Sequence, residues 1–335
     1  MSQKKNVLLL CGGGSSEHEV SLRSADYFSD LLSQIDNVET YRVEIKKNGD
    51  RVLQDGSKVT LTKDGILLNY KDHSETKLNY CIPCIHGAPG ETGQIQALLE
   101  MMELPFYGPS FEASILCFNK VSTKLWLKEC SIPVTPFEMI SDQTSESIKK
   151  AKDFFNKNSS DIFIKSTHQG SSVGCYHVSN EDEVEKKIKE AFKLSPYVLL
   201  EKTIHGRELE VATFNIDENI IATNPGEIIC PNSFYTYEQK YDKESPTQTK
   251  VNAEISTEVS EKVKAYSIQA FKVLKLKDLS RIDFFLTPDD EIYLNEINTF
   301  PGHTKISMFP MIMEAQGQSY LEYLKNKIEK YSRNS

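Results

Sequence analysis

Two stretches near the C-terminal end decide the fold: SRIDFFL at residues 280–286 and IYLNEIN at residues 292–298. Apolar and polar residues alternate in both stretches with the period of two that is typical of a β-strand. The Pro288-Asp289-Asp290 segment between them predicts the turn of a hairpin. Because alternate side chains of a strand point to opposite faces, Arg281 and Asp283 share one face of the first strand, away from its apolar residues.

The polar face of this hairpin collects hard oxygen donors. On the second strand Glu296 and Asn298 also share a face. If the apolar residues of both strands face the core, these two residues lie on the same face of the hairpin as Arg281 and Asp283. Two carboxylates and an amide oxygen are ligands of the kind that Mg²⁺ uses together with substrate phosphates. A solvated sheet face with a surface ion pair is the alternative interpretation. The turn Thr299–His303 follows directly, and its Gly302 lets a backbone N–H approach a ligand, which favours a site.

Outward from the hairpin, apolar runs of strand length alternate with segments of helical period, which predicts an α/β protein. At 335 residues, three domains of about 100 residues each fit this pattern best. We expect strands over 7–11, 41–45, 80–85, 161–165, 174–178, 197–200 and 208–214, with short polar strands within 48–70. We expect helices over 21–34, 94–102, 119–130, 144–157, 181–192, 259–274 and 321–331.

The composition argues against several classes of protein. The chain carries 39 basic and 48 acidic side chains, a net charge of −9, whereas a surface that tracks nucleic acid needs a basic stripe. The longest apolar run near the start, Val7–Cys11, is far shorter than the roughly 20 residues of a membrane span. Gly12 also interrupts it before it reaches the length of a signal peptide. We therefore expect a cytoplasmic protein that contacts neither nucleic acid nor membrane.

Seven cysteines, scattered and mostly within apolar segments, are typical of reduced, buried thiols. Cys81 and Cys84 have the spacing of a redox pair, but such a pair usually opens a helix, where the thiol pKa is lowered. Here both lie inside the apolar run 80–85, which predicts a buried strand. A zinc site would need a second pair of ligands at similar spacing, and the sequence contains none. A redox protein is therefore the least favoured alternative.

Two glycine-rich segments lie between predicted elements, where α/β proteins bind ligands. Residues 12–18 lack the third glycine of a dinucleotide fingerprint and the Gly-Lys-Ser/Thr of a phosphate-binding loop. Glu17 would repel phosphate and favours a cationic group, with a simple turn before a helix as the alternative. Residues 170–174 follow Lys165, and their N–H groups and hydroxyls suit phosphates, with a hairpin turn as the alternative. The tyrosine-rich segment 233–241 predicts a long loop that closes as a lid.

Taken together, these segments resemble the D-alanine–D-alanine ligases of the ATP-grasp superfamily. The resemblance extends from about Lys5 to Leu324 and rests on six motifs in the family's order. They are GGGSSEHEVS (12–21), HG…GE (86–91), K…GSSVG (165–174), Y…KY (235–241), RID (281–283) and NEINTFPG…SM (295–308). The resemblance implies an open parallel α/β domain at 1–119 and two α+β domains that clamp ATP, at 120–204 and 205–335, with a lid at about 232–246.

The resemblance also implies a reaction, the joining of two D-alanines for peptidoglycan precursor synthesis. ATP would phosphorylate the carboxylate of one D-alanine, and the amine of the second would attack the acyl phosphate. Two Mg²⁺ ions, for which Mn²⁺ can substitute, would be held by Asp283, Glu296 and Asn298. The residues that the resemblance assigns to ATP are Lys120, Lys165, Ser171, Ser172, Glu201, Lys202, Ile204, Glu208 and Lys240.

Further residues are assigned to catalysis and to D-alanine. Glu17 would bind the first ammonium group, with Ser171 and Tyr241 hydrogen-bonded around it. Arg281 and the Gly302 N–H would stabilise the oxyanion that forms as the amine adds. The remaining substrate contacts would come from His86, Ser307 and the backbone of Met308, and the family suggests a homodimer.

Two positions depart from the family's pattern. Thr92 stands where an acid usually follows Glu91, and His303 replaces the usual apolar residue beside Gly302. Neither change removes a residue assigned to chemistry. Two alternative functions keep the same scaffold: a ligase that uses D-lactate or D-serine as the acceptor, and a non-catalytic nucleotide-binding protein.

Overall fold

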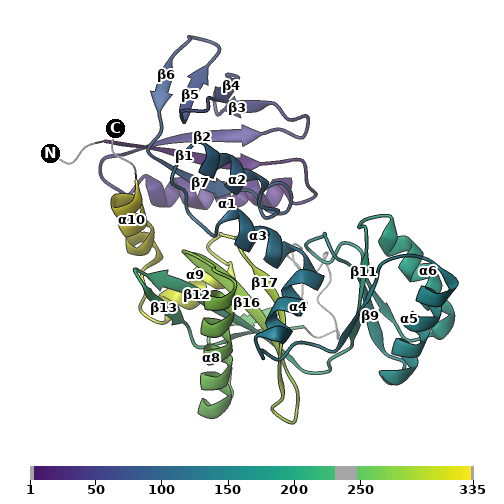
Figure 1. Ribbon diagram of the computed structural model, residues 1–335. Helices are drawn as coiled ribbons and strands as arrows, with labels where there is room; N and C mark the ends of the chain where they lie inside the picture. Colours follow the sequence, from purple (N-terminus) through teal and green to yellow (C-terminus); the bar gives the residue numbers. More distant parts are fainter. Residues whose placement is uncertain (1–3, 231–246, 333–335) are drawn as a thin grey trace.

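The first predicted strand forms the centre of the N-terminal sheet (Figure 1). In the computed structural model, which describes residues 4–230 and 247–332, β1 (Lys5–Gly12) runs parallel to both β2 (Val38–Ile45) and β7 (Tyr80–Cys84). Side chains of β1 are buried from Val7 onward because helices cover both faces. These helices are α1 (His18–Leu32), which packs on Val7 and Leu9, and α2 (Gln94–Met101), which packs on Leu8 and Leu10. The remaining strands are β3 (Arg51–Leu53), which pairs with β2, and the small sheet of β4 (Val59–Leu61), β5 (Ile66–Asn69) and β6 (Glu75–Lys77).

The turn from β1 into α1 is fixed by a glycine and a serine. Gly12 has a φ of +86°, and a Cβ there would lie 2.4 Å from the Ile45 carbonyl oxygen, so only glycine fits. Ser21 Oγ accepts a hydrogen bond from Gly12 N (2.8 Å) and donates one to Cys84 O (2.5 Å). The helix begins at His18, so the predicted start at Ser21 is wrong. Ser21 already lies inside the first turn of α1, and its side chain ties the helix to the sheet.

The central unit is an antiparallel sheet in the order β10-β9-β11-β8, with α5 and α6 packed on one face (Figure 1). Alternation along β9 places Ile162 and Ile164 in the core with these helices, and Lys165 on the other face. The elements are β8 (Phe137–Ile140), α5 (Ser145–Lys157), β9 (Ile162–Ser166), β10 (Cys175–Val178), α6 (Glu181–Phe192) and β11 (Val198–Lys202).

The C-terminal unit contains the predicted hairpin within a six-stranded antiparallel sheet. Arg281 lies opposite Asn298, and Asp283 lies opposite Glu296, so the polar face predicted from the alternation is confirmed. Ile282 and Ile297 pack into the core on the other face. The strands are β12 (Arg207–Ile216), β13 (Asn219–Ala222), β14 (Gly226–Ile229), β15 (Gln248–Lys250), β16 (Leu279–Leu286) and β17 (Ile292–Asn298), and the helices are α8 (Thr257–Val273), α9 (Met308–Ala315) and α10 (Tyr320–Tyr331).

Two helices that connect the units complete the fold. Between the three units lie α3 (Phe111–Phe118) and α4 (Lys120–Glu129) (Figure 1). Their side chains Ala113 and Leu127 belong to the core beneath β12 and β16. The N-terminal and C-terminal units also share one core, in which Phe28 of α1 packs in the same cluster as Phe309 of α9.

The cysteines are all free thiols, and Cys81 and Cys84 are completely buried. Burial raises the pKa of both thiols, which removes the thiolate that a redox pair needs. The prediction of buried structural cysteines is therefore confirmed for this pair. Within the described residues, no helix combines the length and apolar character needed to cross a membrane.

Candidate active site

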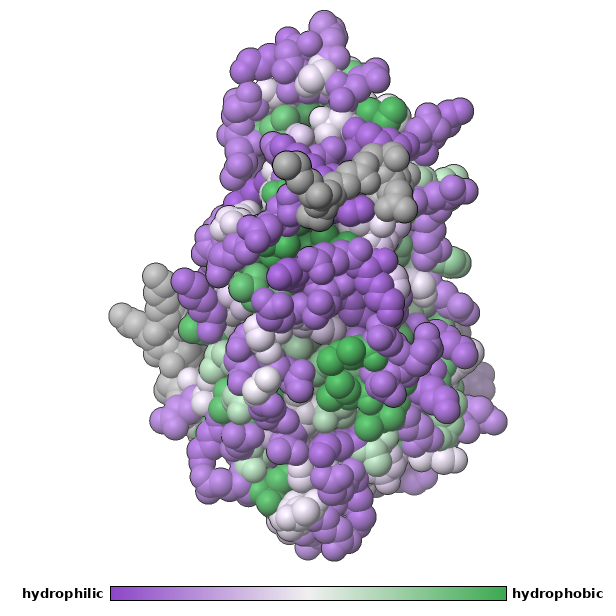
Figure 2. Space-filling view, turned by 90° about the vertical axis from the view of Figure 1, so that its left-hand side faces the viewer, coloured by the Kyte–Doolittle hydropathy of each residue, from purple (hydrophilic) through white to green (hydrophobic). Residues whose placement is uncertain are grey.

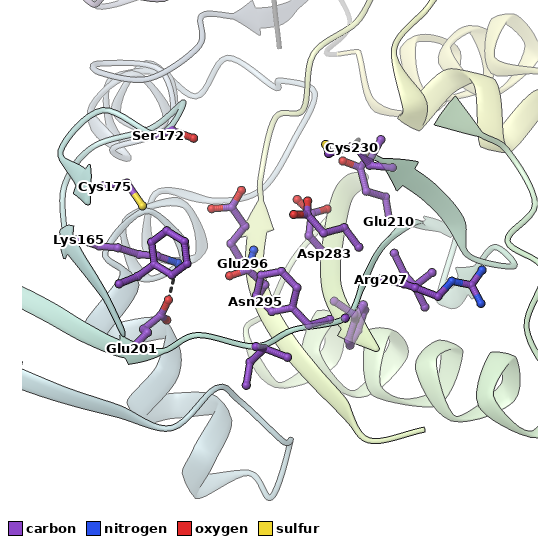
Figure 3. Close-up of a pocket in the computed structure, with 18 of the residues that line it drawn as sticks. Lys165, Ser172, Cys175, Glu201, Arg207, Glu210, Cys230, Asp283, Asn295 and Glu296 are labelled. Carbon is purple, nitrogen blue, oxygen red and sulfur yellow. Dashed lines mark ion pairs between the residues drawn. The ribbon is translucent and has the colours of Figure 1, made fainter. Parts of the chain in front are cut away.

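Two cavities adjoin where the three units meet. The larger, about 380 Å³, lies between the sheet of the central unit and the β16–β17 hairpin (Figure 3). The smaller, about 130 Å³, lies between the start of α1, the loop after β9 and the turn after β17. The side chains that line both cavities are Lys120, Gln169, Ser171, Arg281 and Glu296. A group bound in one cavity is therefore within reach of a group bound in the other.

The larger cavity brings together every described residue to which the sequence assigned ATP binding. They are Lys120, Lys165, Ser171, Ser172, Glu201, Lys202, Ile204 and Glu208, while Lys240 lies outside the described residues. Their elements explain the gathering, because the open face of β9, the end of β11 and the start of β12 all border this space. Ser171 and Ser172 both have left-handed backbone angles, with φ of +48° and +61°, in the loop that covers one side.

A buried ion triad closes the inner wall of the larger cavity. Glu201 on β11 pairs with Lys124 of α4 at 2.6 Å and with Lys165 of β9, and it accepts a third hydrogen bond from Thr135. Burial disfavours the charged carboxylate, but the two ammonium groups hold the pKa of Glu201 at about 2. Burial lowers the pKa of Lys124. For Lys165, which is closer to solvent, the attraction of Glu201 outweighs burial and raises the pKa.

The hairpin supplies the acidic wall of the larger cavity. Figure 3 shows the carboxylates of Asp283 and Glu296 side by side on the face that lines the space. Arg281 donates to both oxygens of Asp283 at 2.8 Å, and Asn298 Nδ2 donates to Asp283 Oδ2 at 2.9 Å. The guanidinium of Arg281 also lies 3.3 Å from Glu210 Oε1. Sequence reasoning did not assign Glu210, although the β12–β16 register places it directly opposite Asp283.

The smaller cavity contains the residues assigned to the first D-alanine. Ser171 Oγ donates to Glu17 Oε1 at 2.5 Å, which joins the N-terminal unit to the loop after β9. His86 and Gly302 line the same cavity, while Tyr241 lies outside the described residues. Ser307 is the N-cap of α9, and its Oγ lies 3.5 Å from where a Cβ on Gly302 would be.

The assignments of Met308 and Gly302 concern their backbone atoms. The side chain of Met308 is packed in the core shared by the N-terminal and C-terminal units, so only its backbone is available to a ligand. Gly302 itself does not have a positive φ, and a Cβ there would make only an ordinary contact, so glycine is not required by backbone geometry.

Glu91 belongs to the motif HG…GE (86–91), but sequence reasoning assigned no role to its side chain. It lines the smaller cavity, and its Oε2 accepts a hydrogen bond from Gly87 N at 3.1 Å. Burial, together with the nearby charge of Glu17, raises the pKa of Glu91 to about 8. A glutamate that retains its proton near neutral pH is a signal that only three-dimensional burial reveals.

Comparison with known proteins decides the family. Residues 6–109 match the model described as the D-ala D-ala ligase N-terminus, and residues 126–329 match the model of the D-ala D-ala ligase C-terminus. The chain belongs to the D-alanine–D-alanine ligase family. A relative of that name from Shewanella sediminis is 48% identical over 332 residues, which cover 98% of this chain and 99% of the relative. Another, from Shewanella woodyi, is 47% identical over 97% of both chains.

Solved structures of the family match the whole fold. D-alanyl-alanine synthetase A from Vibrio cholerae superimposes with a TM-score of 0.93 at 42% identity, covering 99% of both chains. The VanG D-Ala:D-Ser ligase from Enterococcus faecalis has a TM-score of 0.86 at 26% identity, covering 98% of this chain and all of that one. The three-unit ATP-grasp architecture expected from the sequence is thereby confirmed.

Family membership also settles the class of reaction. D-alanine–D-alanine ligases are ATP-dependent enzymes, so the predicted ligase class and its nucleotide are confirmed, and the non-catalytic alternative is not supported. The curated relatives at 46–48% identity carry the name D-alanine–D-alanine ligase. The alternative with D-lactate or D-serine as the acceptor is therefore not favoured.

Proposed function

We propose that this chain joins two D-alanines into D-alanyl-D-alanine, with ATP converted to ADP and phosphate through an acyl phosphate. The observation that carries this proposal is the seam between the two cavities, which Lys120, Ser171, Arg281 and Glu296 line from both sides. A nucleotide in the larger cavity would present its terminal phosphate to a small carboxylate in the smaller one. The second amine would then attack the same carbon and displace phosphate.

The charges of the larger cavity support a requirement for divalent cations. Its lining holds five basic side chains and six acidic ones, so a bare triphosphate would meet no net attraction. No three His, Cys, Asp or Glu side chains of the described residues gather closely enough to hold a metal alone. Asp283, Glu296 and Asn298 offer two carboxylates and an amide, which fits Mg²⁺ or Mn²⁺ ions that complete their shells with phosphate oxygens. When bound, such ions neutralise charge on the transferring phosphoryl group.

The nucleotide would be held mainly by the central unit. Lys120 and Lys165 would bind phosphates after exchanging their present partners, the Gln169 carbonyl and Glu201. The end of β11, with Lys202 and Ile204, would border adenine. Glu208 at the start of β12 would take the ribose. Lys240 belongs to the same proposal on the strength of its motif alone.

The first D-alanine would be oriented by residues of the smaller cavity, and the second by residues that follow its Gly302 in the chain. Glu17 would bind the ammonium group of the first D-alanine, with Ser171 and Tyr241 around it, and His86 nearby. Arg281 and the Gly302 N–H would stabilise the oxyanion. Ser307 and the backbone of Met308 open helix α9, whose N–H groups suit the carboxylate of the second D-alanine.

We also infer that the enzyme acts in the cytoplasm, where ATP is available, and as a homodimer. Five of the large apolar side chains that are exposed among the described residues lie on helices α2 to α4, which makes this surface our candidate for the interface. They are Met101, Phe111, Ile115, Leu125 and Trp126. By contrast, the face seen in Figure 2 is mainly hydrophilic, with apolar residues in small separate areas.

The direct test is phosphate release from ATP and Mg²⁺ with D-alanine, L-alanine, D-lactate and D-serine in turn, with products identified by mass. We expect release with D-alanine alone and a dipeptide as the product. Glu17→Gln should raise the KM for D-alanine at least tenfold and leave the KM for ATP within about twofold, because the change removes the charge that pairs with the ammonium group and replaces no residue assigned to ATP. If no amino acid stimulated release in the wild-type protein, the proposed function would be wrong.

A further inference from the structure

The turn that carries Gly302 is held by residues of the N-terminal unit. His303 N donates to Ser24 Oγ at 3.2 Å, and His86 Nδ1 lies 3.2 Å from the Phe300 carbonyl oxygen. Ser24 Oγ and His86 Nε2 are themselves 2.8 Å apart. Both flanks of Gly302 are therefore tied to one serine–histidine pair, which comes from α1 and from the end of β7. Ser24 is completely buried, and His86 is 3% exposed.

The Phe300 carbonyl and the His303 backbone N–H fix the direction of two hydrogen bonds in this group. The Phe300 carbonyl can only accept, so Nδ1 of His86 must carry a proton. Ser24 accepts from the His303 N–H, and its own hydrogen can go to Nε2 of His86 when that nitrogen is unprotonated. The neutral Nδ1–H form of His86 thus satisfies every partner. Burial, opposed by the charge of Glu17, lowers the pKa of this ring and favours the same neutral form.

A third bond fixes the peptide plane of Gly302. The Nδ1 of His303 lies 2.6 Å from the Pro301 carbonyl oxygen, to which it must donate. The Pro301 carbonyl and the Gly302 N–H belong to one planar peptide unit and point in opposite directions. Holding the carbonyl therefore sets the direction of the N–H. The same peptide borders the smaller cavity, which Pro301 and Gly302 both line.

We propose that Ser24 and His86 are positioning residues that clamp the Phe300–His303 turn, so that the Gly302 N–H is held in the direction required by the developing oxyanion. This inference rests on the proposed function. It also gives His86 a role distinct from substrate contact, because both ring nitrogens are engaged by the protein. Since the clamp spans the N-terminal and C-terminal units, the oxyanion donor is rigid only when the two units are docked.

The clamp should affect one chemical step more than the other. Oxyanion stabilisation matters most when the amine adds to the acyl phosphate, whereas phosphoryl transfer depends on the nucleotide side of the seam. The variant Ser24→Ala removes two bonds of the chain with little change in volume. We expect dipeptide formation to slow about tenfold or more, part of the loss caused by removing such a donor outright. Exchange of ¹⁸O from the β–γ bridge of labelled ATP, which reports reversible formation of the acyl phosphate, should persist.

The matched control is Ser114→Ala, which removes another completely buried helical serine hydroxyl, outside both cavities. It should leave both steps unchanged. Equal slowing of exchange and of dipeptide formation by Ser24→Ala, or no slowing of either, would overturn the clamp while wild-type ligation still stood. A wild-type protein that forms no dipeptide would instead overturn the proposed function.

Two substitutions of His86 separate positioning from substrate contact. Asn places its amide N–H near the position of Nδ1 and can keep the bond to the Phe300 carbonyl, whereas Gln reaches toward Nε2 and leaves that carbonyl unpaired. We expect His86→Asn to retain several-fold more kcat than His86→Gln, with the KM for D-alanine within about threefold of wild type in both. A large rise in that KM with kcat preserved would show that His86 contacts the substrate and would overturn the positioning role.

Discussion

The burial of His303 determines how this single residue affects stability. Burial lowers its pKa to about 3, against an ordinary value of 6.5. Between these two values the unfolded chain binds a proton that the folded protein does not, so the free energy of unfolding falls as the pH falls below about 6.5. At about 1.4 kcal/mol per pH unit, moving from pH 8 to pH 5 should cost about 2 kcal/mol through this residue. Urea unfolding at both pH values measures this effect. Between pH 8 and pH 5 the free energy of unfolding of His303→Leu should fall by about 2 kcal/mol less than that of the wild-type protein.

The control for His303 is His73→Gln, a change at an exposed histidine. It should lose as much stability between pH 8 and pH 5 as the wild-type protein. His86 has a pKa shifted in the same direction, but it is present in every variant and cancels in the comparison. If His303→Leu and the wild type lost equal stability, His303 would not be buried in its neutral form.

At this scale the sequence predicted residue types better than their surroundings. Glu17, Arg281 and Asp283 were assigned to the site because their motifs or the strand period single them out, and the structure brings them to the lining of the two cavities. The importance of Glu91 and Lys124 could not be seen, because it depends on burial beside charges far away in the chain. A motif identifies a side chain, whereas a shifted pKa belongs to its three-dimensional environment.

Among the secondary-structure elements, α4, β9 and β11 depend on one buried charge cluster. Lys124→Met would leave Glu201 with one ammonium partner instead of two in a buried environment. Removing a partner from a buried ion pair commonly costs about 3–5 kcal/mol, and we expect about 3 kcal/mol here because Lys165 remains. Urea unfolding at pH 7 measures this cost. The control Lys128→Met, on the exposed side of the same helix, should change stability by less than about 0.5 kcal/mol. A similarly small effect of Lys124→Met would mean that the triad does not hold these elements together.

The predicted elements differ in accuracy for a physical reason. The β16–β17 hairpin and α6 were predicted well because one face of each is apolar and the other polar. Helices α3 and α9 were not predicted, since each has only eight residues with apolar side chains on most faces, which hides the helical period. Strands β8, β13, β14 and β15 have three or four residues each, too few for a recognisable alternation.

For the whole molecule, the N-terminal and C-terminal units are joined through their interiors. Asp278, at the start of β16, pairs with Lys327 of α10 at 2.8 Å and accepts a hydrogen bond from Gly108 N at 2.9 Å. The same interface includes the shared core of α1 and α9. The central unit has a separate core of its own. The division of the chain at 119 and 204 stays a prediction, but this arrangement favours motion of the central unit against a more rigid pair.

The apolar side chains on α2 to α4 bear on how whole molecules associate. Ile115 is 54% exposed on α3, and Trp126 is 43% exposed on α4. If this surface joins two copies, Ile115→Asp would bury a charge against the partner in the dimer and cost nothing comparable in the monomer. We expect sedimentation to change from dimer to monomer at micromolar concentration, with thermal stability of the monomer little changed.

The control Ile216→Asp replaces an isoleucine of similar exposure, 42%, on β12, outside this group, and should sediment like the wild type. A dimer that persists in Ile115→Asp would exclude the α2–α4 surface as the interface. Because residues of a single chain line both active-site cavities, the monomeric variant should retain most of the ligase activity.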